Sequence, residues 1–123
     1  RDVDFALTVI NFAPLSPADL DRRVRCHPRR IRDLGAHSYQ DELVGPAQTD
    51  CFRVAKTHLG ERVVKDETAA TIAIVTAGTV TAEVGGEAHT LHTYDKIFLP
   101  AGLGPVSYTP HPSAEILECF PPT

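Results

Sequence analysis

The sequence contains no methionine, not even at position 1, where a natural polypeptide begins with one. Processing can remove an initial methionine, so two interpretations stay open: a complete chain or a piece of a longer protein. Cysteine is also scarce: Cys26, Cys51 and Cys119 form an odd set with no close pair in sequence. Such a set fits reduced thiols better than a disulfide framework, so we expect a cytoplasmic protein.

Long apolar runs and a basic surface are lacking as well. No run approaches the ~18 apolar residues that a membrane-spanning helix needs, and no basic-then-apolar leader opens the chain. The net charge of −4 and the pI near 5.8 argue against nucleic acid or anionic membrane as a partner. Acidic residues and a proline interrupt the single basic cluster, which we interpret as solvated: Arg22, Arg23, Arg25, Arg29, Arg30 and Arg32.

The first 35 residues predict short helices and a connector. Asp2 or Asp4 is a plausible N-cap for a helix that ends near Asn11. Ser16 at an N-cap, followed by proline and then by Asp19 at the capping-box position, predicts a second helix. Three prolines and the arginines indicate that residues 13–35 are a connector wrapping a surface and not a second folded domain, so residues 1–35 consist of short helices and this connector.

From about Cys51 onward the pattern becomes that of β-strands. Alternating or β-branched apolar runs are separated by glycine and proline, and Gly85-Gly86 marks a hairpin. Seven or eight strands at this spacing predict a mainly β fold, an antiparallel barrel or sandwich over residues 36–123. The clearest strand segments are residues 50–59, 71–78, 79–84, 87–92, 96–102, 105–110 and 114–120.

The order of these segments resembles a cupin, a small jelly-roll barrel. The glycine turn at Gly78, the hairpin after it and the sequence LPAG match the two cupin motifs. The resemblance also locates the metal ligands of that family. The glutamate position falls at or near Thr71, the His-x-His positions fall within Lys65–Thr68, and the last histidine position falls on Pro105. None of these residues builds a histidine-rich metal site, so we expect a metal-free cupin.

The whole chain resembles the C-terminal part of class I mannose-6-phosphate isomerase. The resemblance is carried by the order of VDFALTVINF, CFRVAKTHLG, VTAGTVTAEVGGEAHTLHTYDKIFLPAGLGPVSY and AEILECFP. It implies a parent enzyme that interconverts mannose 6-phosphate and fructose 6-phosphate. In that family zinc is bound in an N-terminal catalytic barrel, which is absent here. The resemblance therefore implies a non-catalytic domain with no catalytic residue and no cofactor of its own, packed on that catalytic domain; homodimerisation is the alternative.

A second hypothesis is a free-standing degenerate cupin that binds a sugar phosphate or another small molecule. It requires polar groups that converge in the barrel mouth, and the sequence offers His58, Arg62 and Lys65 as candidates.

Other chemistry-bearing residues favour structural roles. Cys26, His27, His37 and Cys51 fit no compact zinc spacing. Carboxylates at Asp66, Glu67, Glu83 and Glu87 are expected to be solubilising. Cys119, in an apolar strand, is expected to be a buried structural thiol.

Overall fold

The N-terminal segment begins with a short helix whose cap is set by local sequence. The computed structural model describes residues 2–123. Helix α1 (Val3–Thr8) starts after Asp2, whose carboxylate accepts a hydrogen bond from the backbone N–H of Phe5 at 3.1 Å. The helix ends before the predicted end near Asn11, and none of its residues is buried.

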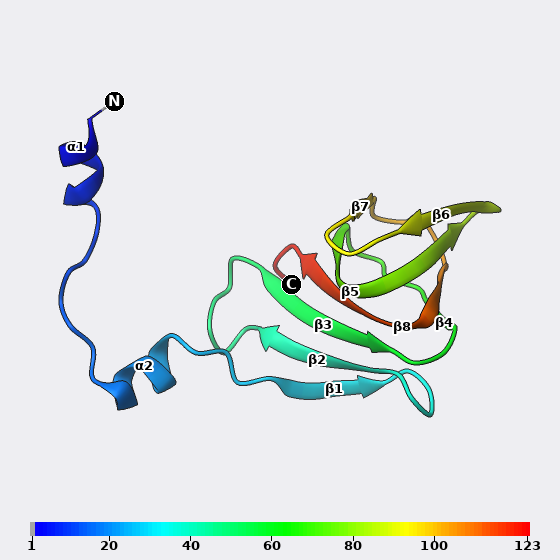
Figure 1. Cartoon of the computed structure of the whole chain (residues 1–123), viewed down its shortest axis with the longest axis horizontal. Helices are drawn as coiled ribbons and strands as arrows, with labels where there is room; N and C mark the ends of the chain where they lie inside the picture. Colours follow the sequence, from blue (N-terminus) through cyan, green and yellow to red (C-terminus); the bar gives the residue numbers. More distant parts are fainter. Residues whose placement is uncertain (1) are drawn as a thin grey trace.

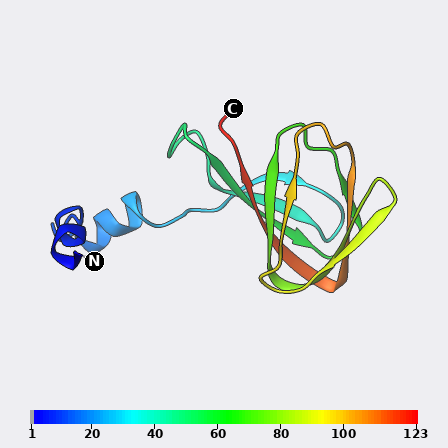
Figure 2. The ribbon, with the colours of Figure 1, turned by 90° about the horizontal axis from the view of Figure 1, so that it is seen from above.

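A second short helix, α2 (Pro17–Arg23), confirms the predicted capping signal. The Ser16 hydroxyl accepts a hydrogen bond from the backbone N–H of Asp19 at 3.1 Å, and Pro17 occupies the first turn. Both helices lie away from the β-structure, joined to it by an extended segment (Figures 1 and 2). No helix in residues 2–123 is long and apolar enough to cross a membrane.

Eight antiparallel strands form one strongly curved sheet, which confirms the predicted mainly β fold. The order along the sheet is β1-β2-β3-β8-β5-β6, with β4 paired to β8 and β7 paired to β5. Seen from above, the sheet curls into a barrel (Figure 2). The strands are β1 (Arg29–Asp33), β2 (Tyr39–Val44), β3 (Arg53–Leu59), β4 (Val63–Lys65), β5 (Thr71–Val84), β6 (Glu87–Leu91), β7 (Lys96–Leu99) and β8 (Val106–Phe120).

Two long strands, β5 and β8, belong to both walls of the barrel. The N-terminal part of β5 pairs with β7 and with the end of β8, whereas its C-terminal part pairs with β6 and with the start of β8. The ladder is irregular on either side of Gly78. Gly78 has a φ of +77°, and a Cβ there would lie 2.2 Å from the backbone oxygen of Ser113. Only glycine therefore fits where the two long strands bend together.

The apolar core lies between these two walls. Its fully buried members come from alternate positions of the strands, as the two-residue period of a strand requires. The largest are Tyr108, Leu59, Ile116, Val75 and Val80, all under 3% exposed.

The strand assignments differ from the sequence prediction in five places, two of which are the unpredicted strands β2 and β4. The segment predicted as a connector contains β1, an exposed edge strand held by ion pairs across to β2. Residues 71–78 and 79–84 form one strand, β5, and residues 105–110 and 114–120 are joined in β8. Pro110 lies opposite Val80, next to the irregular part of the ladder, where a missing N–H is tolerated.

Candidate functional site

The barrel interior holds a buried ion pair. The Nζ of Lys65 lies 2.6 and 2.7 Å from the two carboxylate oxygens of Glu118, and each side chain is about 1% exposed. Lys65 ends β4, beside the first part of β8, whereas Glu118 lies near the end of β8, opposite Ala55 and Ala73. The pair therefore joins the two walls of the barrel through its interior.

Neutral polar side chains complete the environment of Glu118. Gln40 on β2 donates hydrogen bonds from Nε2 to Thr57 at 3.1 Å and to Glu118 at 3.2 Å. The hydroxyl of Thr57 on β3 donates to the same carboxylate. No buried side-chain nitrogen or oxygen in residues 2–123 lacks a hydrogen-bond partner. A fully satisfied network of this kind holds its members in fixed positions.

Two further charged residues extend this network to the surface. The Glu67 carboxylate lies 3.3 Å from the Lys65 Nζ and also pairs with Arg32 on β1. The Nε of Arg32 donates a hydrogen bond to the amide oxygen of Gln40 at 3.0 Å. Burial alone would raise the pKa of Glu67, but the charge of Lys65 and the hydrogen bond from Arg32 outweigh it and hold that pKa below its ordinary value.

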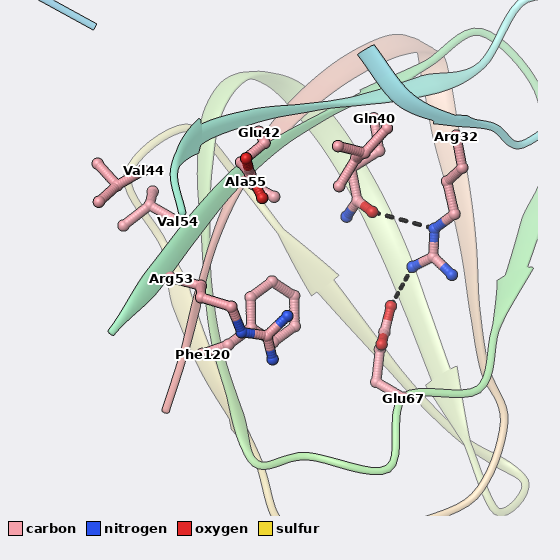
Figure 3. A pocket seen from close by; sticks show the side chains of 10 residues that line it. Arg32, Gln40, Glu42, Val44, Arg53, Val54, Ala55, Glu67 and Phe120 are labelled. Atoms are coloured by element: carbon pink, nitrogen blue, oxygen red, sulfur yellow. Dashed lines mark hydrogen bonds and ion pairs between the residues drawn. The ribbon is translucent and has the colours of Figure 1, made fainter. Parts of the chain in front are cut away.

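The outer end of the network lines an open pocket of about 270 Å³ (Figure 3). Its walls come from β1, β2, β3 and the end of β8, and Glu67 lies at one side. The guanidinium of Arg53 lies over the ring of Phe120, 5.0 Å from its centroid (Figure 3). The lining combines charged and amide groups with apolar side chains: Ile31, Arg32, Gln40, Glu42, Val44, Arg53, Val54, Ala55, Glu67 and Phe120.

A phenol belongs to the same interior. Tyr108 is about 1% exposed and lines a small cavity that Lys65, Glu67 and Glu118 also border. Burial, reinforced by the negative charge of Glu118 and Glu67, raises the pKa of Tyr108 well above its ordinary value. The phenol therefore remains protonated and contributes no charge to the site.

The structure separates the three binding candidates suggested by the sequence. Lys65 lies in the interior, whereas His58 lies on the other face of β3, 3.1 Å from Glu115 and stacked on Tyr39. Arg62 is exposed in the short connection between β3 and β4. Only Lys65 belongs to the polar network.

Five residues of the site were not predicted from the sequence, although one of them, Glu118, carries a signal: Glu118, Gln40, Thr57, Arg32 and Arg53. In β8 the buried positions alternate, and Glu118 falls in phase with Ile116 and Phe120. A charge in phase with the apolar face of a strand indicates a buried ion that needs a partner. Two of the carboxylates expected to be solubilising were Asp66 and Glu67; Asp66 is exposed, whereas Glu67 belongs to the network.

The interior does not fit a metal ion. Carboxylate oxygens of Glu118 and Glu67 face the centre, but the Lys65 ammonium already occupies the position between them. A metal ion there would meet a positive charge instead of a free set of ligands. Residues 2–123 also contain no cluster of three or more His, Cys, Asp and Glu side chains suited to a metal.

Comparison with known proteins identifies the fold. No protein-family model matches the chain, and no curated protein sequence matches it. The EutQ protein of Clostridium difficile is similar in structure, with a TM-score of 0.65 at 16% identity over 76% of this chain and 75% of that chain. KdgF from Halomonas sp. has a TM-score of 0.62 at 15% sequence identity, over 75% of this chain and 86% of that chain. An RmlC-like cupin from Shewanella frigidimarina has a TM-score of 0.63 at 15% sequence identity, over 80% of this chain and 85% of that chain. The chain therefore has the cupin fold, here with a lysine–glutamate pair in its interior.

Proposed function

We propose that this cupin domain binds a small polar molecule in the pocket between β1, β3 and the end of β8, and that it catalyses no reaction by itself. The observation that carries the proposal is the contact between this pocket and the buried network. Gln40 and Glu67 line the pocket and also belong to the network, in which Gln40 accepts a hydrogen bond from Arg32 and Glu67 pairs with Arg32 and Lys65. A ligand would thus meet polar groups that are already fixed.

The size and chemistry of the pocket support a ligand the size of a monosaccharide. A volume of about 270 Å³ lies near the lower end of ordinary ligand sites, which span about 300–1,000 Å³. The amide of Gln40 and the carboxylates of Glu42 and Glu67 can form hydrogen bonds with hydroxyl groups. The face of the Phe120 ring is already covered by Arg53, so polar contacts would give most of the specificity.

Amide chemical-shift mapping tests this proposal. Titration with mannose, glucuronate and mannose 6-phosphate should shift the signals of Gln40, Arg53 and Glu67 in a saturable manner. The outer face of β3 around His58, on the other side of the strand, is the internal control and should not respond. The proposal fails if none of these probes shifts the pocket signals at millimolar concentration.

A second candidate function is the one implied by the resemblance to class I mannose-6-phosphate isomerase. It is favoured by the N-terminal segment, which exposes large apolar side chains to solvent. Val3, Phe5, Val9 and Phe12 are 67, 69, 78 and 71% exposed, and such a surface is typical of one that packs on another domain. In this hypothesis the chain is the non-catalytic C-terminal domain of a zinc-dependent aldose–ketose isomerase.

The intact mass of the polypeptide made from the native gene tests this second candidate. The hypothesis expects a mass well above 13.4 kDa, zinc in the full protein, and isomerase activity that this chain alone lacks. A native polypeptide of about the mass of this chain, or a longer one without isomerase activity, would contradict it.

A further inference from the structure

We infer that the ligand of this pocket carries a carboxylate or phosphate group, and that Arg53 binds this group. The inference rests on the proposed function of the pocket and adds the chemical class of its ligand. It is carried by the distribution of ion pairs around the pocket and by the position of the Arg53 side chain.

Every carboxylate in or next to the pocket already has a cationic partner. These groups therefore neutralise one another and leave little negative charge to attract a cation. The pairs are Glu42 with Arg29 at 2.9 Å, Glu67 with Arg32 and with Lys65 at 3.3 Å, and Glu118 with Lys65 at 2.6 Å.

Arg53 lines the pocket without a carboxylate partner. It lies within 4.0 Å of no carboxylate in residues 2–123, and its one hydrogen bond runs from Nε to the backbone oxygen of Pro121, at 3.4 Å. Of the charged residues that line the pocket, Arg32, Glu42 and Glu67 all belong to ion pairs, so Arg53 is the one whose charge no carboxylate within 4.0 Å balances. An anionic ligand would balance this charge.

The geometry of Arg53 suits an anion with two oxygens. Its guanidinium lies over the ring of Phe120, which is 8% exposed and therefore fixed in the wall of the barrel (Figure 3). The Nε of Arg53 already donates to Pro121, so its two Nη groups remain to donate two parallel hydrogen bonds. Carboxylate and phosphate groups accept such a pair of hydrogen bonds, whereas a neutral hydroxyl does not.

The rest of the lining defines the remainder of the ligand. Gln40 and Glu67 lie on the side of the pocket that Arg32 borders, away from Arg53, whereas Glu42 lies near Ala55 and Val54 (Figure 3). Their oxygens can accept hydrogen bonds from hydroxyl groups. The ligand class is therefore a small hydroxylated anion, such as a sugar acid or a sugar phosphate, with its charged end at Arg53.

Calorimetric titration with glucuronate, mannose 6-phosphate and neutral mannose tests the inference. Both anions should bind more tightly than mannose, and Arg53→Gln should weaken anion binding by about 10- to 100-fold, the range expected for a lost charged hydrogen bond. The matched control is Arg62→Gln, which removes the same charge from an exposed position outside the pocket and should leave binding unchanged. The two anions distinguish the carboxylate from the phosphate source.

Arg53→Lys adds a second comparison, because it keeps the charge but loses the planar fork; it should lie between the wild type and Arg53→Gln. Unchanged melting temperatures show that all three variants fold. The inference is overturned if mannose binds as tightly as the anions, or if Arg53→Gln behaves like Arg62→Gln. Either result would leave the proposed binding function of the pocket in place, for a ligand that Arg53 does not select. The absence of binding by all three probes would overturn the proposed function as well.

Discussion

Replacing Lys65 with methionine should destabilise the barrel strongly, because it leaves Glu118 as a buried charge without its counterion. The methionine side chain fills most of the space of the lysine stem, so lost packing contributes little. Removing one partner of a buried ion pair typically costs about 3–5 kcal/mol of unfolding free energy. Thr57 and Gln40 still donate hydrogen bonds to Glu118, and this places the expected cost at the lower end, about 3 kcal/mol.

That cost is a large fraction of the stability of an ordinary domain, which is about 5–15 kcal/mol. It corresponds to a fall in melting temperature of about 10–15 °C for a domain of this size. Chemical denaturation at neutral pH measures the free energy directly, and a thermal melt checks it.

Lys56→Met is the matched control, since it makes the same substitution in a surface pair. Lys56 lies 3.0 Å from Glu115, but both side chains are about one-third exposed, so the loss should be about 0–1 kcal/mol. The double variant Lys65→Met/Glu118→Gln keeps an acceptor for Thr57 without a buried charge and should recover at least half of the loss. Equal stability of Lys65→Met and Lys56→Met at neutral pH would refute the reasoning.

Two further predictions concern pH and thiol chemistry. Because the pKa of Glu67 lies below its ordinary value near 4.5, its ionised form stabilises the folded state at higher pH, and that contribution is lost as the pH falls below about 4.5. Thermal melts from pH 6 to pH 3 should therefore show a smaller acid-side loss in Glu67→Gln than in the wild type, and identical profiles would contradict this. Burial, with the charge of Glu118, raises the pKa of the half-buried Cys119 thiol, so a thiol reagent should modify the exposed Cys26 and Cys51 first. Peptide mass mapping of a partly labelled sample decides the order, and early labelling of Cys119 would show that this strand opens readily.

Features that depend on neighbouring residues could be predicted from the sequence. The cap of α2 is one, because Ser16 and Asp19 contact each other within a single turn. The hairpin at Gly85-Gly86 is another: both glycines adopt positive φ, of +56° and +85°, which few other residues tolerate. In each case the residues that carry the signal also make the contacts.

Features that depend on distant residues could not be predicted. The strand Arg29–Asp33 has no alternating apolar residues; its cross-strand partners, Glu42 and Asp41, neutralise its arginines only once β2 is aligned beside it. Lys65 and Glu118 are 53 residues apart, so neither residue indicates the other. That Arg53 has no carboxylate partner is likewise a property of the assembled pocket, because the carboxylates near it, Glu42 and Glu67, pair with Arg29 and Arg32.

The buried pair also bears on how uniquely the chain folds. Side chains along a strand repeat every two residues, so a shift of β8 by two positions would keep an apolar side chain at almost every inward position. The same shift would place Ile116 or Phe120 against Lys65 and leave its ammonium without a partner. The alternation of apolar side chains alone allows the shifted pairing, whereas the shift would break the ion pair between Lys65 and Glu118. On this hypothesis the pair selects one alignment among several of similar hydrophobicity, and Lys65→Met/Glu118→Gln should show a second set of amide signals from shifted chains; a single set would argue against it.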